Sequence, residues 1–314
     1  MKRNVMINLK HLLIFLLPAI LISCGKEDPL TPAVELTINQ TVVNEAEFSL
    51  LETAVTRAGL EGYLENTNNL TVFAPRNIAL TNANYPEAAI LAAAPADLGK
   101  IIKYHVLTTR LTTATLPNGP NAEVTTALGE KAYITKTGTS VFINGVLVTT
   151  ADIGTKNGVI HAVNTLLVPP VGNITATLPV LPDLNYFTTA ILRANNSGTN
   201  VTAALSVAGP LTIFAPTNQA FIDAGYPTLA SINSADPNTL KNIILYHVIA
   251  SRTFSNDLVN NSTPATLQGG MVAITTTGGA KVKGNGNATA STITRANIVA
   301  TNGVVHVIDR LLIP

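Results

Sequence analysis

The segment that decides the fold is LTVFAP at residues 70–75, because it returns almost unchanged as LTIFAP at residues 211–216. Two further motifs recur in the same order and with nearly the same gaps: YHV at 104–106 and 246–248, and NGVIH at 157–161, which returns as NGVVH at 302–306. Three motifs in a fixed order indicate a tandem duplication. Each copy has the length of an ordinary domain, so the chain contains a first and a second repeat of one fold.

Each repeat starts with helical patterns. In the first repeat, apolar residues recur at helical spacing over residues 48–58, and Gly59 can end that helix. The LTVFAP segment is β-branched and aromatic, which predicts a strand that ends at Pro75. Asn77 and Asn218 then stand where the N-cap of the next helix is expected. The motif therefore predicts a strand-to-helix corner.

A second helix follows in each repeat, with Pro95 or Pro237 in its first turn, and it runs into the Tyr-His pair. Short alternating segments separated by Gly-containing turns then predict several strands. The strand after each Asn-Gly turn is apolar on both faces, so it should be central and covered on both sides. The expected class is α+β: two tandem domains, each a mostly antiparallel β-sheet wedge wrapped by helices.

The N-terminal residues have the pattern of an export signal. Basic residues precede an apolar run at 12–22, which is too short to span a bilayer, and LISC at 21–24 resembles a bacterial lipobox. We therefore expect a signal peptide at 1–23, lipidation of Cys24 and a tether at 24–43. An ordinary signal peptide with an incidental cysteine is the alternative.

Composition narrows the compartment and the partners. The chain has a formal charge of +1, only 12% charged residues and no Trp, which disfavours nucleic acid and anionic membrane surfaces as partners. Cys24 is the single cysteine, so a disulfide within the chain is impossible. No serine-hydrolase elbow, Walker loop, cysteine nucleophile or calcium loop is present in the sequence, and we expect neither an enzyme nor a cofactor.

The repeated motifs resemble those of the fasciclin (FAS1) domain family. TVFAP is similar to its first signature, Tyr-His to its middle one, and NGVVHVIDRLLIP at 302–314 to its second. The resemblance implies a fasciclin-like domain 1 at 44–170, a linker at 171–182 and a fasciclin-like domain 2 at 183–314. The first repeat departs from the pattern at two positions, Arg76 and Asn164. The second repeat keeps an aspartate, Asp309, at the position that matches Asn164.

Four histidines occupy two equivalent pairs of positions: His105, His161, His247 and His306. A zinc site needs three or four converging ligands, but each repeat offers two histidines and no cysteine. We therefore expect structural roles for the histidines, with His247 at least half buried and hydrogen bonded, and likewise a structural role for Asp309.

The resemblance also suggests adhesion residues. In animal members of the family, an Asp-Ile pair and a Tyr-His segment are linked to integrin adhesion. The matching candidates are Asp152, Ile153, Tyr104 and His105 in the first repeat, and Tyr246 and His247 in the second. The second repeat has Asn297 where the first has Asp152, which removes the acid. The alternative is that this carboxylate stabilises the turn into the last strand.

The expected function is adhesion at the cell envelope, with an extracellular protein or a polysaccharide as ligand. Lys26-Glu27-Asp28 beside Cys24 resembles the surface-export signal of Bacteroidetes lipoproteins, so an outer-membrane lipoprotein displayed on the cell surface is favoured over the periplasmic face. Two similar modules on one anchor would add weak contacts through avidity. A glycan- or nutrient-capturing lipoprotein is a second reading, and a hydrolase with an unfamiliar site is a third.

Overall fold

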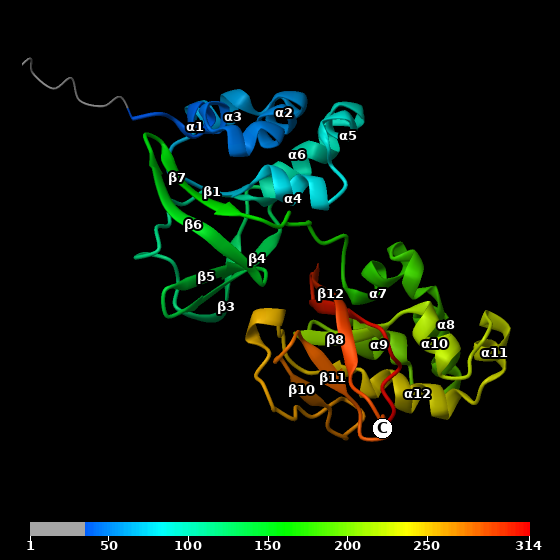
Figure 1. The fold of residues 1–314 in the computed structure, drawn as a ribbon. Coiled ribbons are helices and arrows are strands. Elements are labelled where there is room, and N and C mark those ends of the chain that lie inside the picture. Colours follow the sequence, from blue (N-terminus) through cyan, green and yellow to red (C-terminus); the bar gives the residue numbers. More distant parts are fainter. Residues whose placement is uncertain (1–34) are drawn as a thin grey trace, which may run out of the picture. The chain divides into compact units, whose positions relative to one another are not determined.

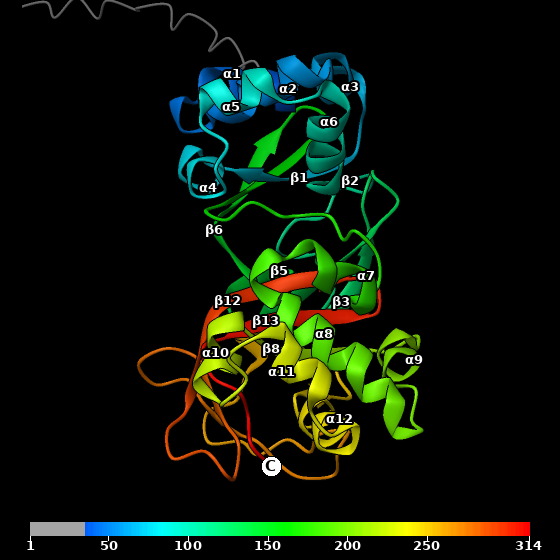
Figure 2. The same cartoon turned by 90° about the vertical axis from the view of Figure 1, so that its right-hand side faces the viewer.

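The computed structural model describes residues 35–314, which form one compact unit. This unit contains two domains, one for each repeat, whose α-helices follow the same order, and each combines helices with one β-sheet (Figures 1 and 2). The expected α+β class is therefore confirmed.

In the first repeat the helices precede most of the strands, and Figure 1 shows α1, α2 and α3 gathered on one side of β1 and β7. The helices are α1 (Ile38–Asn44), α2 (Ser49–Ala58), α3 (Glu61–Asn66), α4 (Asn77–Asn82), α5 (Glu87–Ala92) and α6 (Pro95–Tyr104). The strands are β1 (Leu70–Pro75), β2 (Val106–Leu107), β3 (Gly119–Thr125), β4 (Lys131–Thr137), β5 (Ser140–Ile143), β6 (Val146–Thr155) and β7 (Gly158–Val163).

The second repeat uses the same plan with a shorter sheet. Its helices are α7 (Ile174–Thr177), α8 (Asn185–Ala194), α9 (Val201–Ser206), α10 (Asn218–Asp223), α11 (Leu229–Ser234) and α12 (Pro237–Tyr246). Its strands are β8 (Leu211–Pro216), β9 (Val248–Ile249), β10 (Ala273–Thr275), β11 (Lys281–Lys283), β12 (Ser291–Ala300) and β13 (Gly303–Ile308).

Each sheet is built around the strand that follows the Asn-Gly turn. The strand orders are β2-β1-β7-β6-β5-β4-β3 and β10-β11-β12-β13-β8-β9. Within each sheet one pair is parallel, β1 with β7 or β8 with β13, and the other pairs are antiparallel. Every residue of β7 and β13 is buried, so the expected central position is confirmed. Gly158 and Gly303 permit the parallel pairs, because a Cβ there would lie 2.2 Å from a carbonyl oxygen of the neighbouring strand.

The domain boundaries expected from the sequence are too narrow. Residues expected in the tether and the linker form α1 and α7, and Ile38 and Ile174 are fully buried in the two cores. Asn157 in the turn before β7 accepts a hydrogen bond from the Ile38 amide, and Asn302 does the same for Ile174. Each domain therefore includes a short helix that lies upstream of its recognisable motifs. No sequence motif in that segment predicts the helix.

The strand-to-helix corner also differs in detail from expectation. Arg76 and Thr217 are the N-caps of α4 and α10, and Asn77 and Asn218 are the first helical residues. The Asn77 side chain accepts from the Leu50 amide at 2.9 Å and donates to a carbonyl in the preceding turn. The two asparagines therefore join the corner to α2 and α8 rather than capping their own helices, and Asn218 makes the equivalent contacts.

The expected signal peptide, Cys24 and most of the expected tether lie outside the described residues. Among residues 35–314, none of the helices is both long enough and apolar enough to cross a membrane. The two prolines expected at helix starts, Pro95 and Pro237, are confirmed at the first position of α6 and α12.

Candidate functional site

The Tyr-His pairs are part of the core. His247 closes α12 and is fully buried, with Nδ1 donating to the Ile243 carbonyl at 2.8 Å and Nε2 accepting from the Leu312 amide at 2.9 Å. Because one partner is a carbonyl and the other an N–H, the ring must be neutral, with its proton on Nδ1. Burial lowers the pKa of His247 to about 4, although the Ile243 carbonyl opposes the change. The expected burial and hydrogen bonding of His247 are what the structure contains.

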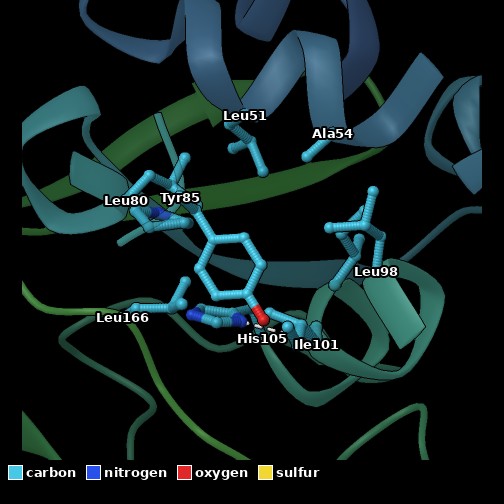
Figure 3. A pocket seen from close by; sticks show the side chains of 10 residues that line it. Leu51, Ala54, Leu80, Tyr85, Leu98, Ile101, His105 and Leu166 are labelled. Carbon is cyan, nitrogen blue, oxygen red and sulfur yellow. Dashed lines mark hydrogen bonds between the residues drawn. The ribbon is translucent and has the colours of Figure 1, made fainter. Parts of the chain in front are cut away.

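His105 repeats this arrangement in the first domain. Its ring bonds the Ile101 carbonyl and the Leu167 amide, and burial lowers its pKa to about 4. Figure 3 shows the ring enclosed by Tyr85 and by leucines from several elements. The cavity beside it measures about 10 Å³, which is room for about one water molecule and for no ligand.

These positions rule out direct adhesion through the Tyr-His pairs. Tyr104 and His105 are 1% and 2% exposed, and Tyr246 and His247 are fully buried. The Tyr104 hydroxyl donates to the Lys131 carbonyl, and that of Tyr246 donates to the Met271 carbonyl. The sequence interpretation of these four residues as adhesion contacts is wrong, because a partner could reach them only by opening the core.

The histidines of the central strands hold a loop against β6 or β12. His161 Nδ1 accepts from the Asp152 amide, and Nε2 donates to the Leu111 carbonyl. His306 makes the same pair of bonds with the second-repeat residues Asn297 and Thr253. Both rings are fully buried. Burial lowers the pKa of His306 to about 4. Burial also lowers the pKa of His161, but there the nearby Asp152 charge opposes the change.

Asp309 also makes contacts that fit a structural role. Its Oδ1 accepts hydrogen bonds from the Ser291 hydroxyl and the Thr292 amide, and this fixes the start of β12 beside the end of β13. Within residues 35–314, no three histidine, cysteine or acidic side chains come together in a way that could hold a metal ion.

Asp152 occupies a bulge of β6 and faces the same loop. Its φ is +59°, a left-handed conformation that asparagine and aspartate tolerate better than most residues. The carboxylate accepts from both the amide and the hydroxyl of Thr113, the amide at 2.8 Å. Burial opposes ionisation, but the Thr113 hydrogen bonds and the Lys136 charge outweigh it and hold the pKa of Asp152 below its usual value. Asp152 is thus an exposed, ionised and well-oriented carboxylate, and the neighbouring Ile153 packs partly against the core.

The equivalent face of the second repeat is covered. Asn297, also at positive φ, bonds the Ser255 amide just as Asp152 bonds that of Thr113. Its Nδ2 also donates to the Gly145 carbonyl of the first repeat at 3.3 Å. Gly145 leaves room for this approach, because a Cβ there would lie 2.5 Å from the Asn297 side chain.

Arg252 is the centre of the contact between the repeats. Its guanidinium lies 3.9 Å from the centroid of the Tyr133 ring of the first repeat and donates to the Gly303 carbonyl at 2.7 Å. The Arg252 carbonyl accepts from Asn121 at 2.9 Å. Phe254 packs against the same tyrosine with ring centroids 6.1 Å apart, and both rings are buried. A cation–π contact, aromatic packing and two hydrogen bonds, from Asn121 to Arg252 and from Asn297 to Gly145, therefore join the domains.

The first repeat keeps only part of this surface. The Thr71 hydroxyl donates to the Thr109 carbonyl, and the equivalent Thr212 hydroxyl donates to the Ser251 carbonyl. Arg110 and Arg252 are the next residues along the chain, so Arg110 is the counterpart of Arg252. Arg110 is exposed. Two places further along, Phe254 is replaced by the partly exposed Thr112. We call the surface formed by Arg110, Thr112, Thr113 and Asp152 the Asp152 face.

Sequence reasoning missed the arginines and the aromatic contact. A signal existed for the arginines, because Arg110 and Arg252 each follow the histidine of the Tyr-His pair by the same number of residues. Tyr133 and Phe254 carried no such signal, since neither aromatic residue has a counterpart in the other repeat.

Comparison with known proteins assigns the class. The family model "Fasciclin domain" matches residues 46–169 and 185–314. The chain therefore belongs to the fasciclin domain family, and it carries two copies of that domain.

Relatives occur in animals and bacteria. The chain is 26% identical over 257 residues to transforming growth factor-beta-induced protein ig-h3 of Sus scrofa, covering 80% of this chain and 35% of that protein. It is 34% identical over 114 residues to an uncharacterized protein of Synechocystis, covering 36% of this chain and 80% of that protein. The chain thus spans about a third of the length of the animal relative.

Among solved structures, one similar chain is a FAS1 domain pair from the insect cell adhesion molecule fasciclin I. It is 19% identical, with a TM-score of 0.42, and the match covers 87% of this chain and 98% of that chain.

Proposed function

We propose that this protein is a cell-envelope adhesin whose Asp152 face binds an extracellular ligand. The observation that carries the proposal is the difference between the two repeats. The face around Asn297 binds another domain of the same chain, whereas the equivalent Asp152 face is exposed and carries an arginine and an ionised carboxylate. A surface that serves for docking in one repeat is suited to docking in the other.

The chemistry of this face favours a protein ligand over a polysaccharide. Arg110 can stack on an aromatic ring of a partner as Arg252 stacks on Tyr133, and Asp152 can accept from backbone or basic groups. Glycan sites instead use exposed aromatic platforms. Within residues 35–314, none of the large exposed hydrophobic residues is aromatic. The role is one of binding without catalysis.

The proposal is tested by binding of the purified protein to immobilised extracellular matrix proteins and to polysaccharides. Asp152→Asn reproduces the residue of the second repeat and can keep the hydrogen bond to the Thr113 amide, so the fold should persist. We expect it to weaken protein binding about tenfold, because a charged contact is lost from an oriented pair. Arg110→Ala should weaken binding by a similar factor.

The matched control is Asp223→Asn, which changes an exposed acid on α10. It should bind like the unaltered protein. If Asp152→Asn and Arg110→Ala also bind like the unaltered protein, the Asp152 face is not the adhesion site.

The proposed lipid anchor requires a separate experiment, because it rests on the sequence around Cys24. Metabolic labelling with a fatty-acid probe should mark the unaltered protein and spare Cys24→Ser. Equal labelling of both would refute the anchor and leave the binding face untouched.

A further inference from the structure

A mostly apolar groove lies between the repeats, beside their contact. Its volume is about 610 Å³, and it is lined by the turn between β5 and β6, the connection between the domains, α7 with the 3-10 turn after it, and β12. It is continuous with the contact between the repeats, because Gly145 and Asn297 line it as well.

The groove collects aliphatic side chains that are left in water. Val168, Val171 and Val180 are 63%, 62% and 59% exposed, and Leu147 is 46% exposed. Covering such side chains is favourable, because apolar surface is then removed from water. Leu147 and Val168 come from the first repeat, and Val171 and Val180 come from the expected linker. Residues 295–299 of β12 in the second repeat complete the lining, so a molecule in the groove would contact all three segments.

Most of the polar side chains in the lining are already engaged in hydrogen bonds or an ion pair. Asn144 bonds the Tyr133 amide and the Tyr104 hydroxyl, Asn297 bonds Ser255, and the Thr177 hydroxyl donates to a backbone carbonyl. The guanidinium of Arg295 is paired with Asp183 at 3.1 Å. A sugar or a charged group placed here would lose water without gaining equivalent partners, and that loss is unfavourable.

The size and the chemistry together select a ligand class. Ligand cavities in proteins have about 300–1,000 Å³, are mostly apolar and occur preferentially between domains. We propose that this groove binds a free amphiphile with a single aliphatic chain, its chain in the groove and its head group in solvent. This site is distinct from the Asp152 face and goes beyond the proposed adhesion.

The test is an equilibrium titration of the purified protein with dansyl-labelled undecanoic acid, followed by competition with unlabelled palmitic acid and, separately, with maltohexaose. Saturable binding of one probe per chain, displaced by palmitic acid and not by the sugar, is expected. Val180→Asp and Val171→Asp should each weaken the probe at least about tenfold, because a carboxylate is placed in the apolar lining.

Both substituted valines are exposed, so these variants should fold, and Val259→Asp is the matched control because Val259 is 66% exposed and lies outside the groove. The proposal is overturned if binding does not saturate, if Val180→Asp binds as well as the unaltered protein, or if Val259→Asp weakens binding equally. It is also overturned if the probe does not bind and sedimentation shows a dimer that Val180→Asp dissociates, since a second copy would then cover the groove.

Discussion

The Asp152 face and its counterpart around Asn297 share a backbone design but have opposite surroundings. In both faces, the side chain of a residue at positive φ accepts a hydrogen bond from a neighbouring loop, and a buried histidine accepts a hydrogen bond from the backbone amide of that residue. In the second repeat Phe254 fills the centre of the face, and the first repeat covers it. In the first repeat Thr112 takes that place, and the face remains exposed. The presence of one aromatic side chain thus distinguishes the surface that holds the domains together from the surface that is open to a partner.

A second difference concerns an ion pair beside the strand-to-helix corner. Glu47 pairs with Arg76 at 2.8 Å in the first repeat, and Asp183 pairs with Arg295 at 3.1 Å in the second. The two acids are equivalent, but Arg76 follows β1 whereas Arg295 lies on β12, at the position that Thr150 occupies on β6. The place of the pair is retained while its cation comes from another element, because the two cation positions are neighbours: in the first repeat Arg76 donates a hydrogen bond to the Thr150 hydroxyl.

Acid should distinguish the repeats most strongly. Histidines with a folded pKa of about 4 and an ordinary value of 6.5 take up protons first in the unfolded chain. The free energy of unfolding therefore falls as pH drops from 6.5 towards 4, by about 3 kcal/mol for each ring. The second repeat has two such rings, His247 and His306, and should lose about 6 kcal/mol.

In the first repeat, burial lowers the pKa of His161, but the Asp152 charge acts to raise it. The first repeat should therefore lose less stability in acid. Hydrogen exchange followed by mass spectrometry at pH 7 and at acidic pH reports on each repeat separately. Asp152→Asn should bring the first repeat closer to the second. Equal loss of protection in the unaltered repeats would contradict the expected difference.

Removing a Tyr-His histidine should have the next largest effect. His247→Ala leaves the Leu312 amide and the Ile243 carbonyl without their partner and opens a cavity, at a cost of about 3–5 kcal/mol. His105→Ala should cost the first repeat a similar amount. Urea denaturation measures both, and a change below about 1 kcal/mol would show that the rings are not structural.

The paired arginines should then separate the two faces. Arg252→Ala removes the stacking on Tyr133 and the bond to the Gly303 carbonyl, and should lower the unfolding free energy by about 1–3 kcal/mol. Arg110→Ala should change the unfolding free energy by less than about 0.5 kcal/mol, since Arg110 is exposed.

A double-mutant cycle with Tyr133→Leu should give a coupling of about 1 kcal/mol with Arg252→Ala. The same cycle with Arg110→Ala should give none. Additive effects in both cycles would mean that the contact between the repeats contributes nothing to stability.

Moving the cation that pairs with Glu47 from position 76 to position 150 should have the smallest effect on stability. Arg76→Thr removes the partner of Glu47 but supplies a capping hydroxyl like that of Thr217, which accepts from the Ala220 amide. Adding Thr150→Arg should restore the pair from the place used in the second repeat. Because exposed pairs contribute up to about 1 kcal/mol, thermal unfolding should place the double variant within about 0.5 kcal/mol of the unaltered protein. A double variant less stable than Arg76→Thr alone would refute the equivalence of the two positions.

Much of the fold was predictable because its signals are local. The strand of LTVFAP, the prolines that start α6 and α12, and the fully apolar central strands each follow from residue type and periodicity. The site was less predictable. The Tyr-His pair matched a family adhesion segment, but no local pattern states that its rings point into the core. The helices α1 and α7 were missed because a few residues carry too little periodicity, and only their contacts with Asn157 and Asn302 define them.

By itself the sequence determined the duplication and the α+β class, and it predicted structural roles for the histidines, since each inference depends on motifs or on counts of residues. The tertiary structure alone decided which surface remains exposed. Asp152 and Asn297 have equivalent places in the sequence, but their surroundings differ because Arg252 and Phe254 meet Tyr133 across the two repeats. Such a meeting depends on how two folded surfaces fit each other, and periodicity along one chain carries no information about that fit.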